Sequence, residues 1–421
     1  MKKYDLVVVG GGFSGFCAAV SAARHGLKVL LAEQSNCLGG AAANALVNPF
    51  MRYWTMEDNK RVYLSKGMFG EIVDKLKSAE AMCEEGSCRH DTKFNEEYLK
   101  LLFNRMAIEA GVQLLYHAYL TGAKVENGTV KSAVFATKSG MIDIEADYFV
   151  DATGDADLAA GCGCPTRLGR DGDHLCQPMT LSFRLGNVDM EKYFETKDKI
   201  NPLYKEYQKK GKIKNIYECV LIFTTMIDGV LHFNSTRVVR KNPLDVFEVT
   251  EAEIDAREQV FELYHFLKEH FEAFKNAELL MTAMQIGVRE SRMIDGDYVL
   301  TGKDIINCTK FEDAVAAANY DIDIHNPEGS GTSHHYFEPG TYYTIPYRCL
   351  IPQKTENLLV VGRCISVDHE AQASCRIMPT CATVGQAAGT AISLAAKGKT
   401  NVRNIDIKKL QTVLKEDGAF F

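Results

Sequence analysis

Two histidines and an arginine in the last third of the chain have side chains suited to acid–base chemistry. His334 and His335 are adjacent in a stretch bounded by glycines, and imidazoles exchange protons near neutral pH. Arg376 adds a permanent positive charge with two parallel donors. We therefore predict that His334 or His335 faces the same cavity as Arg376. A solvent-facing loop is the alternative for the two histidines.

A second group of charged residues is Arg289-Glu290-Ser291-Arg292. One interpretation is an ion-paired helix end at a domain interface, and the other is an arginine that reaches a bound cofactor or an anionic substrate group with bidentate geometry. We predict the second role for Arg289. Asp321, Asp323 and His325 alternate and would share one face of a strand. There we expect a hydrogen-bonded scaffold rather than a metal site.

These side chains need a scaffold, and the N-terminal segment predicts one. Tyr4 to Val9 is an apolar, β-branched run typical of a buried parallel strand, and Phe16 to His25 has the alanine-rich composition of a helix packed on a sheet. Between them stands Gly10-Gly11-Gly12-Phe13-Ser14-Gly15, a G-x-G-x-x-G pattern. A second apolar run ends at Glu33. This order of elements predicts a dinucleotide site.

The glycines and the acid of this segment have separate physical roles. Gly10 makes the tight turn, Gly12 lets the backbone approach a pyrophosphate, and Gly15 lets helix and strand pack closely. The helix N-terminus offers free N–H groups to the phosphates. Glu33 would accept hydrogen bonds from a ribose hydroxyl pair.

Later segments favour FAD over NAD. Gly39-Gly40 lets a loop approach the cofactor a second time, as a flavin with its ribityl chain requires. Ala152-Thr153-Gly154 ends one apolar strand and Gly362-Arg363 ends another. Gly385 to Gly389 lies within an alanine-rich helix, and we expect the N-terminal residues of that helix, from Met378, beside the flavin.

Together with Gln285 to Arg292 and Arg376 to Thr380, these segments resemble the FAD-dependent oxidoreductase family labelled FAD_oxidored, of the glutathione reductase–like two-dinucleotide-binding flavoprotein superfamily. The resemblance covers nearly the whole chain. It implies an α/β fold in which a Rossmann-like FAD-binding domain carries an inserted α+β substrate or cap domain. The residues expected to contact FAD are Gly10, Gly12, Phe13, Ser14, Gly15, Glu33, Gln34, Gly39, Gly40, Ala41, Leu120, Ala152, Thr153, Gly154, Gly362, Arg363 and Met378.

The positions of these motifs divide the chain into three stretches. Residues 1–164 and 344–421 are expected to form the FAD-binding domain, and residues 165–343 the substrate or cap domain. Residues 51–91 are charged and irregular, which predicts a surface excursion from the first stretch.

Local signals predict several further elements. Apolar spacing indicates a helix from Glu96 to Ala110, and Glu126-Asn127-Gly128 indicates a hairpin turn between two strands. Thr250, with Glu253 three residues later, predicts the capped start of a long helix.

Composition limits the class of protein and its partners. A net charge of −7 over 421 residues argues against a nucleic-acid surface. No stretch approaches the ~20 apolar residues of a membrane helix, and the first strand begins too early for a cleavable signal. We therefore expect a cytoplasmic protein. Its expected partners are a small-molecule substrate and an external electron donor or acceptor.

The thirteen cysteines are odd in number and scattered, which predicts free thiols rather than a disulfide framework. Neither Cys83-x4-Cys88 nor Cys162-x-Cys164 has the spacing of a structural zinc site, so no metal is expected. The segment Ala41 to Val47 carries no thiol, which argues against the disulfide reductases of the superfamily.

We predict an FAD-dependent oxidoreductase that moves hydride from a small polar metabolite to flavin N5. Fumarate reductase–like flavoenzymes have a loop histidine and a later arginine at a spacing similar to that of His335 and Arg376, although their N-R-x-G-G pattern is missing here. Two alternatives stay open: reduction of an activated alkene, and a flavin-binding electron-transfer module of a larger assembly. The absence of a second G-x-G-x-x-G weakens an NAD(P)H-fed mechanism, and the absence of iron–sulfur cysteine spacing weakens the assembly.

Overall fold

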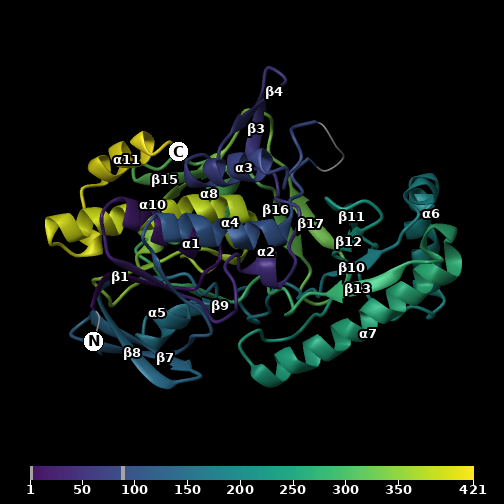
Figure 1. Ribbon diagram of the computed structural model, residues 1–421, viewed down its shortest axis with the longest axis horizontal. Helices are drawn as coiled ribbons and strands as arrows, with labels where there is room; N and C mark the ends of the chain where they lie inside the picture. Colours follow the sequence, from purple (N-terminus) through teal and green to yellow (C-terminus); the bar gives the residue numbers. More distant parts are fainter. Residues whose placement is uncertain (1–2, 87–90) are drawn as a thin grey trace.

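A seven-stranded sheet organises the computed structural model, which describes residues 3–86 and 91–421 (Figure 1). Its parallel strands are β5 (Gln113–Leu115), β2 (Val29–Ala32), β1 (Tyr4–Val9), β8 (Gly140–Asp151) and β19 (Leu358–Val360). The first half of β8 pairs antiparallel with β7 (Thr129–Thr137), which pairs with β6 (Tyr119–Glu126). The second half of β8 pairs with β1 and β19, so one long strand joins a hairpin to the parallel sheet. The Rossmann-like architecture expected from the sequence is confirmed.

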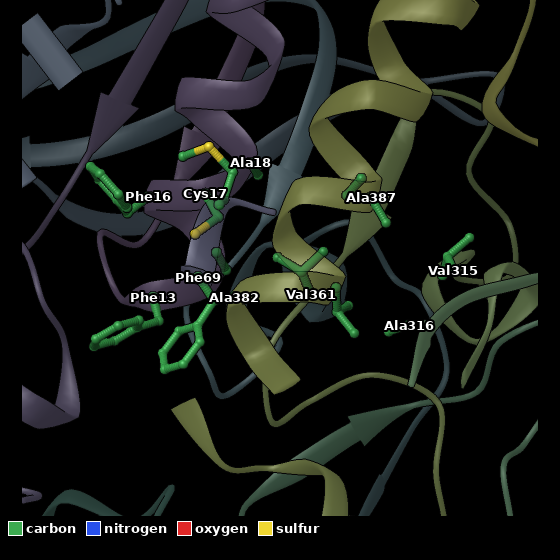
Figure 2. Packing of buried hydrophobic residues seen from close by; sticks show 14 of the residues in the cluster. Phe13, Phe16, Cys17, Ala18, Phe69, Val315, Ala316, Val361, Ala382 and Ala387 are labelled. Carbon is green, nitrogen blue, oxygen red and sulfur yellow. The ribbon is translucent and has the colours of Figure 1, made fainter. Parts of the chain in front are cut away.

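Two helices pack side by side against this sheet (Figure 2). They are α1 (Phe13–Arg24) and α10 (Met378–Gly398), and Cys17 and Ala18 of α1 lie near Ala382 and Ala387 of α10. Phe16 points away from α10 and stacks on Phe103. A Cβ on Gly385 would overlap the carbonyl oxygen of Ser14. Glycine at this position therefore permits the short distance between the two helices.

A second, antiparallel sheet lies beside α6 and α7 (Figure 1). Its order is β11 (Ile222–Thr224), β12 (Leu231–Phe233), β10 (Phe183–Gly186) and β13 (Glu278–Thr282). The helices are α6 (Met190–Lys209) and α7 (Val246–His270), whose apolar faces form a separate core with this sheet. This is the α+β unit predicted to be inserted.

The two apolar cores do not follow the predicted boundaries along the chain. The core of the second sheet contains residues from Met179 to Ile286, together with Leu46. Residues from Met293 to Phe337 pack instead in the core of α1 and α10. The segment before position 343 therefore supports the FAD-binding side, because its apolar residues meet that core rather than the second sheet. The domain limits 165 and 343 stay predictions.

Shorter elements connect the two sheets. Four two-stranded sheets are formed among the described residues by β3 (Trp54–Glu57) with β4 (Lys60–Tyr63), β9 (Thr166–Leu168) with β14 (Arg292–Ile294), β15 (Ala314–Ala318) with β18 (Tyr343–Pro346), and β16 (Ile322–His325) with β17 (Thr332–His335). The remaining helices are α2 (Ala41–Asn44), α3 (Met68–Ser78), α4 (Glu96–Glu109), α5 (Asp157–Gly161), η1 (Glu272–Phe274), α8 (Gly302–Ile306), η2 (Tyr347–Leu350), α9 (His369–Cys375), η3 (Val402–Asn404) and α11 (Ile407–Glu416).

Two local expectations need correction. The long helix begins at Val246 rather than at Thr250, because Asp245 accepts hydrogen bonds from the backbone N–H groups of Phe247 and Glu248 at 2.9 and 3.0 Å. The Thr250 hydroxyl instead donates to the Val246 carbonyl inside the helix.

The expectation of free thiols is wrong at one position. Cys83 is disulfide-bonded, and Cys88, the other cysteine of its motif, lies outside the described residues. Many other cysteines are free: Cys17, Cys37, Cys162, Cys164, Cys176, Cys219, Cys308, Cys349, Cys364, Cys375 and Cys381. Within residues 3–86 and 91–421, no helix combines the length and apolar character needed to cross a bilayer.

Candidate functional site

The carboxyl ends of β1, β2 and β8 meet at a groove of about 340 Å³, which we call the dinucleotide groove. Every residue predicted to contact FAD lines this groove except Gly15. Parallel strands of open α/β sheets bind ligands at this edge. A larger surface cavity, of about 920 Å³ between α1 and α3, contains none of the predicted residues.

The glycines of the first turn show which positions serve the fold and which serve a ligand. A Cβ on Gly10 would overlap the carbonyl oxygen of Ala152, and a Cβ on Gly15 would overlap that of Gly10. A Cβ on Gly12 would meet no described atom closer than the Cα of Gly40, at 3.8 Å. No described side chain caps the N-terminus of α1, whose N-cap residue is Gly12. The open space and the free amides fit a pyrophosphate.

Glu33 follows β2 and is held at the groove by short hydrogen bonds. Its Oε2 accepts from the Gly11 N–H at 2.5 Å, and its Oε1 accepts from the backbone N–H and the hydroxyl of Ser35, both at 2.8 Å. An ionised carboxylate offers about four acceptor positions. These three bonds orient Glu33 and leave capacity for a ribose hydroxyl.

The residues of the Arg289-Glu290-Ser291-Arg292 segment have two different roles: some hold neighbouring segments in place, and one lines a cavity. Arg292 forms an ion pair with Asp157, and the Ser291 hydroxyl donates to Asp155. Glu290 is fully buried and accepts from the Gln177 N–H at 2.8 Å, while His369 Nδ1 lies 2.7 Å from its other oxygen. Three of the four residues therefore brace the surrounding segments, and only Arg289 lines a cavity.

That cavity, which we call the inner cavity, has a volume of about 180 Å³ and adjoins the dinucleotide groove. The two share six wall residues: Ala41, Ala45, Val288, Arg363, Arg376 and Met378. The polar residues of the inner cavity come from β12, from β16 and from the loops around them: Thr180, Ser182, His232, Asn234, Arg289, Tyr320, Asp323 and His325. The predicted residues Arg289 and Arg376 are thus brought together.

Asp323 and His325 lie side by side on β16. His325 Nε2 is 3.4 Å from Asp323 Oδ2, and the Tyr320 hydroxyl donates to the same oxygen at 3.1 Å. Burial disfavours the charged form of Asp323, but the hydrogen bond from His325 and the charge of Arg376 outweigh burial and hold the pKa of Asp323 below its ordinary value. Burial and the charge of Arg289 lower the pKa of His325 to about 4, so this imidazole is neutral at pH 7.

Two further groups of the inner cavity have pKa values shifted by burial. Burial, with Arg376 nearby, lowers the pKa of Arg289 to about 10. Burial, with Arg184 nearby, lowers the pKa of His232 to about 3, and its Nδ1 has no hydrogen-bond partner among the described residues. The cavity therefore contains two neutral imidazoles beside fixed charges.

The structure does not bring His334 or His335, which were predicted to share a cavity with Arg376, into the inner cavity. Both histidines are exposed on β17 and neither lines the inner cavity. The strand pairs with β16 so that His334 lies opposite Asp323, with His334 Nδ1 3.7 Å from Asp323 Oδ1. β17 is the outer strand of this pair, so one strand spacing separates its backbone from the β16 groups that line the cavity.

Sequence reasoning also missed site residues at the end of β12, where His232 lies on the strand and Asn234 directly follows it. His232 and Asn234 are two positions apart, and their apolar neighbours Leu231 and Phe233 are fully buried in the second core. Polar residues at a spacing of two on a strand share one face. The alternation of apolar and polar residues in this segment was the sequence signal that could have identified His232 and Asn234. Asp321 directly precedes β16, pairs with Arg52 at 2.9 Å and does not line the cavity, which agrees with the expected hydrogen-bonded scaffold role of this residue. Among the described residues, no group of three His, Cys, Asp or Glu side chains is arranged to bind a metal ion.

Curated relatives match parts of the chain. Digeranylgeranylglycerophospholipid reductase of Methanocella arvoryzae is 31% identical over 141 residues, which span 31% of this chain and 33% of the relative. The protein of the same name from Thermoplasma acidophilum is 25% identical over 201 residues, spanning 45% of this chain and 49% of the relative. Glutathione reductase of Schizosaccharomyces pombe is 42% identical over 57 residues, 14% of this chain and 12% of the relative. The chain thus spans half the length of these relatives or less.

Solved structures resemble the chain over nearly its full length at low identity. A geranylgeranyl bacteriochlorophyll reductase-like protein from Thermoplasma acidophilum has 15% identity and a TM-score of 0.49, covering 99% of this chain and 84% of that protein. L-proline dehydrogenase from P. horikoshii has 13% identity and a TM-score of 0.47, covering all of both chains. The family model described as FAD dependent oxidoreductase matches residues 5–414. The chain therefore belongs to the FAD dependent oxidoreductase family, and FAD is the cofactor that this family implies.

Proposed function

We propose that the chain transfers hydride between a small polar substrate and the N5 atom of FAD, with the substrate bound in the inner cavity. The supporting observation is the wall that this cavity shares with the dinucleotide groove, including Arg376 and Met378. A substrate placed there would adjoin the cofactor while polar side chains surround it. When bound, FAD supplies the two-electron acceptor.

The size and lining of the inner cavity favour a metabolite rather than a lipid chain. Its volume of about 180 Å³ lies below the ~300–1,000 Å³ of pockets for drug-sized ligands. Its lining includes the polar side chains of Thr180, Ser182, Asn234, Asp323 and His325. Such a wall suits a substrate with several hydrogen-bonding groups.

We assign the proton of the reaction to His325. Its imidazole is neutral at pH 7 because its pKa is about 4, so it can accept a proton from a substrate hydroxyl or amine. Asp323, 3.4 Å away, would stabilise the imidazolium that forms, and Tyr320 orients Asp323 by donating to it. Arg376 would hold the substrate on the side of the shared wall.

Anaerobic reduction of the bound flavin tests this proposal. We expect at least one compound in a panel of hydroxy acids, amino acids, polyols and amino alcohols to bleach the flavin absorbance. His325→Gln should keep FAD and lower the reduction rate by about 10²–10⁴-fold, as expected for a positioned base. His174→Gln, at an exposed position outside both cavities, is the matched control and should behave as wild type.

The same experiment separates the two alternatives. Reoxidation of the dithionite-reduced enzyme by an activated alkene, without bleaching by any reduced metabolite, would replace the proposal with alkene reduction. Electron exchange with a carrier protein alone, and with no small molecule, would identify an electron-transfer module.

A further inference from the structure

We propose that the substrate carries a single carboxylate group and that this group binds Arg289 in the inner cavity. The inference rests on the proposed function, since it names the substrate class of the same cavity. It is carried by the hydrogen bonds of Arg289, by the balance of charges around it and by the position of Arg376.

Every hydrogen bond of Arg289 goes to an uncharged acceptor. Nη1 donates to the Pro178 carbonyl at 2.7 Å and to the Thr180 hydroxyl at 2.6 Å, and Nη2 donates to Asn234 Oδ1 at 3.3 Å. A guanidinium has five N–H groups, so these three bonds leave two without a partner among the described residues. None of the described carboxylates lies within the 4.0 Å of an ion pair with Arg289. The three neutral partners orient the guanidinium but do not neutralise it.

The other charges around the inner cavity are already paired, apart from one excess positive charge. Arg363 donates to Asp155 at 2.5 Å, which leaves Asp323 as the acid of the cavity wall. Arg376 Nη2 lies 3.8 Å from Asp323 Oδ2. Two guanidiniums therefore face one carboxylate. A charge removed from water without a counter-ion is strongly disfavoured, so the cavity is suited to a ligand with one negative charge.

The placement of the two arginines orients such a ligand. Arg376 lines both the groove and the inner cavity, whereas Arg289 lines only the inner cavity. A carboxylate on Arg289 therefore leaves the rest of a small molecule pointing toward the shared wall, where the reacting C–H bond has to lie. The planar fork of a guanidinium matches the two oxygens of a carboxylate.

Binding of the carboxylate would also change the base. The groups that face His325 are Asp323 on its own strand, Thr332 on β17 at 3.1 Å, Arg289, Arg376 and the Tyr217 ring. After burial, the charge of Arg289 is the largest cause that lowers the pKa of His325. A bound carboxylate offsets this charge, so the basicity of His325 rises when substrate is present. With FAD bound as the two-electron acceptor, His325 would take the hydroxyl or amine proton of the substrate while its C–H bond gives up hydride to the cofactor, which leaves a C=O or C=N bond.

Calorimetric titration of the FAD-loaded protein tests the inference with three probes: propionate, propionamide and inorganic phosphate. We expect propionate to bind about 100-fold or more tightly than propionamide, because two charge-assisted hydrogen bonds are lost with the amide. Arg289→Met should remove this preference and Arg289→Lys should retain part of it. Arg257→Met, on the exposed face of α7, is the matched control and should keep it. Equal binding of propionate and propionamide, or tighter binding of phosphate, would overturn the inference.

A second measurement on the wild-type protein does not depend on any variant. Hydrogen–deuterium exchange at the imidazole C2 reports the pKa of His325 with and without propionate, and we expect it to rise on binding. An unchanged value with propionate bound would place the carboxylate away from Arg289 and refute the inference. Flavin bleaching by neutral alcohols or amines without carboxylate selectivity would refute only this inference. Selective propionate binding without any flavin chemistry would refute only the proposed function.

Discussion

Replacement of Gly12 by alanine should separate cofactor binding from folding. The backbone of Gly12 has φ −67° and ψ −177°, which alanine adopts without strain, and the added Cβ would come no closer than 3.8 Å to any described atom. Alanine caps a helix less well than glycine, which destabilises the fold, but it also lowers the entropy of the unfolded chain, which stabilises the fold. Each effect is about 0.5–1 kcal/mol, so the two largely cancel. The apo-protein should therefore unfold within about 1 kcal/mol of wild type.

The same methyl group would occupy the space above the free amides of α1. Loss of about two charge-assisted hydrogen bonds to the pyrophosphate, at ~1.5–3 kcal/mol each, removes roughly 3–6 kcal/mol of binding free energy. The Kd for FAD should rise by about 10²–10⁴-fold.

FAD binding by fluorescence quenching and thermal unfolding of the apo-protein measure the two effects separately. Gly70→Ala is the matched control, because a Cβ there meets no described atom within 4 Å and Gly70 does not line the groove. Gly385→Ala should show the opposite pattern, since its Cβ would overlap the Ser14 carbonyl and destabilise the fold by about 1–3 kcal/mol. An FAD affinity of Gly12→Ala within tenfold of wild type would refute the pyrophosphate role of this position.

Two further predictions concern buried charge. The folded-state pKa values of His232 and His325, about 3 and about 4, lie below the ordinary 6.5, so the unfolded chain binds protons first as the pH falls and stability is lost from pH 6.5 downward. Between pH 7 and pH 5, each of these histidines should lower the free energy of unfolding by about 2 kcal/mol. In urea unfolding over this range, His232→Phe should lose less stability than wild type, whereas exposed His174→Gln should follow wild type. An equal loss of stability in all three proteins would contradict the predicted direction of the effect. Arg184 is paired with buried Glu96, so Arg184→Met should lower the free energy of chemical unfolding by about 3–5 kcal/mol. Adding Glu96→Gln to this variant should restore most of the lost stability. No recovery would show that lost packing, rather than the unpaired carboxylate, causes the effect.

Local patterns in the sequence were sufficient for the cofactor side of the site. The strand, glycine turn and helix from Tyr4 to Arg24 lie where the pattern predicts, since each depends on the sterics and hydrogen bonding of neighbouring residues. The Asn127-Gly128 turn is confirmed in the same way, with φ values of 49° and 77° that these residue types accept. The helix predicted from Glu96 to Ala110 is confirmed as α4.

The burial of a side chain is a less local property, and sequence patterns alone did not separate exposed histidines from those that line the inner cavity. His334 and His335 have the residue types of a proton-transfer site, but they lie on the outer strand of a two-stranded sheet and are exposed. His325, on the inner strand, lines the inner cavity, and His232 reaches it from the second sheet. The residue type alone does not distinguish a solvated histidine from one whose pKa burial lowers.

The sequence by itself determined the cofactor, the family fold and the presence of Arg289 and Arg376 as candidates for the site. Those features follow from motifs of residues that are close together in the sequence, because such motifs set where the backbone turns and which groups lie near one another. Only the tertiary structure decided that Arg289 has neutral partners while Arg292 pairs with Asp157 and Arg363 pairs with Asp155. The partner of each charge comes from distant segments that packing brings together, and packing also decides which charges are removed from water. That balance determines the chemistry of the inner cavity.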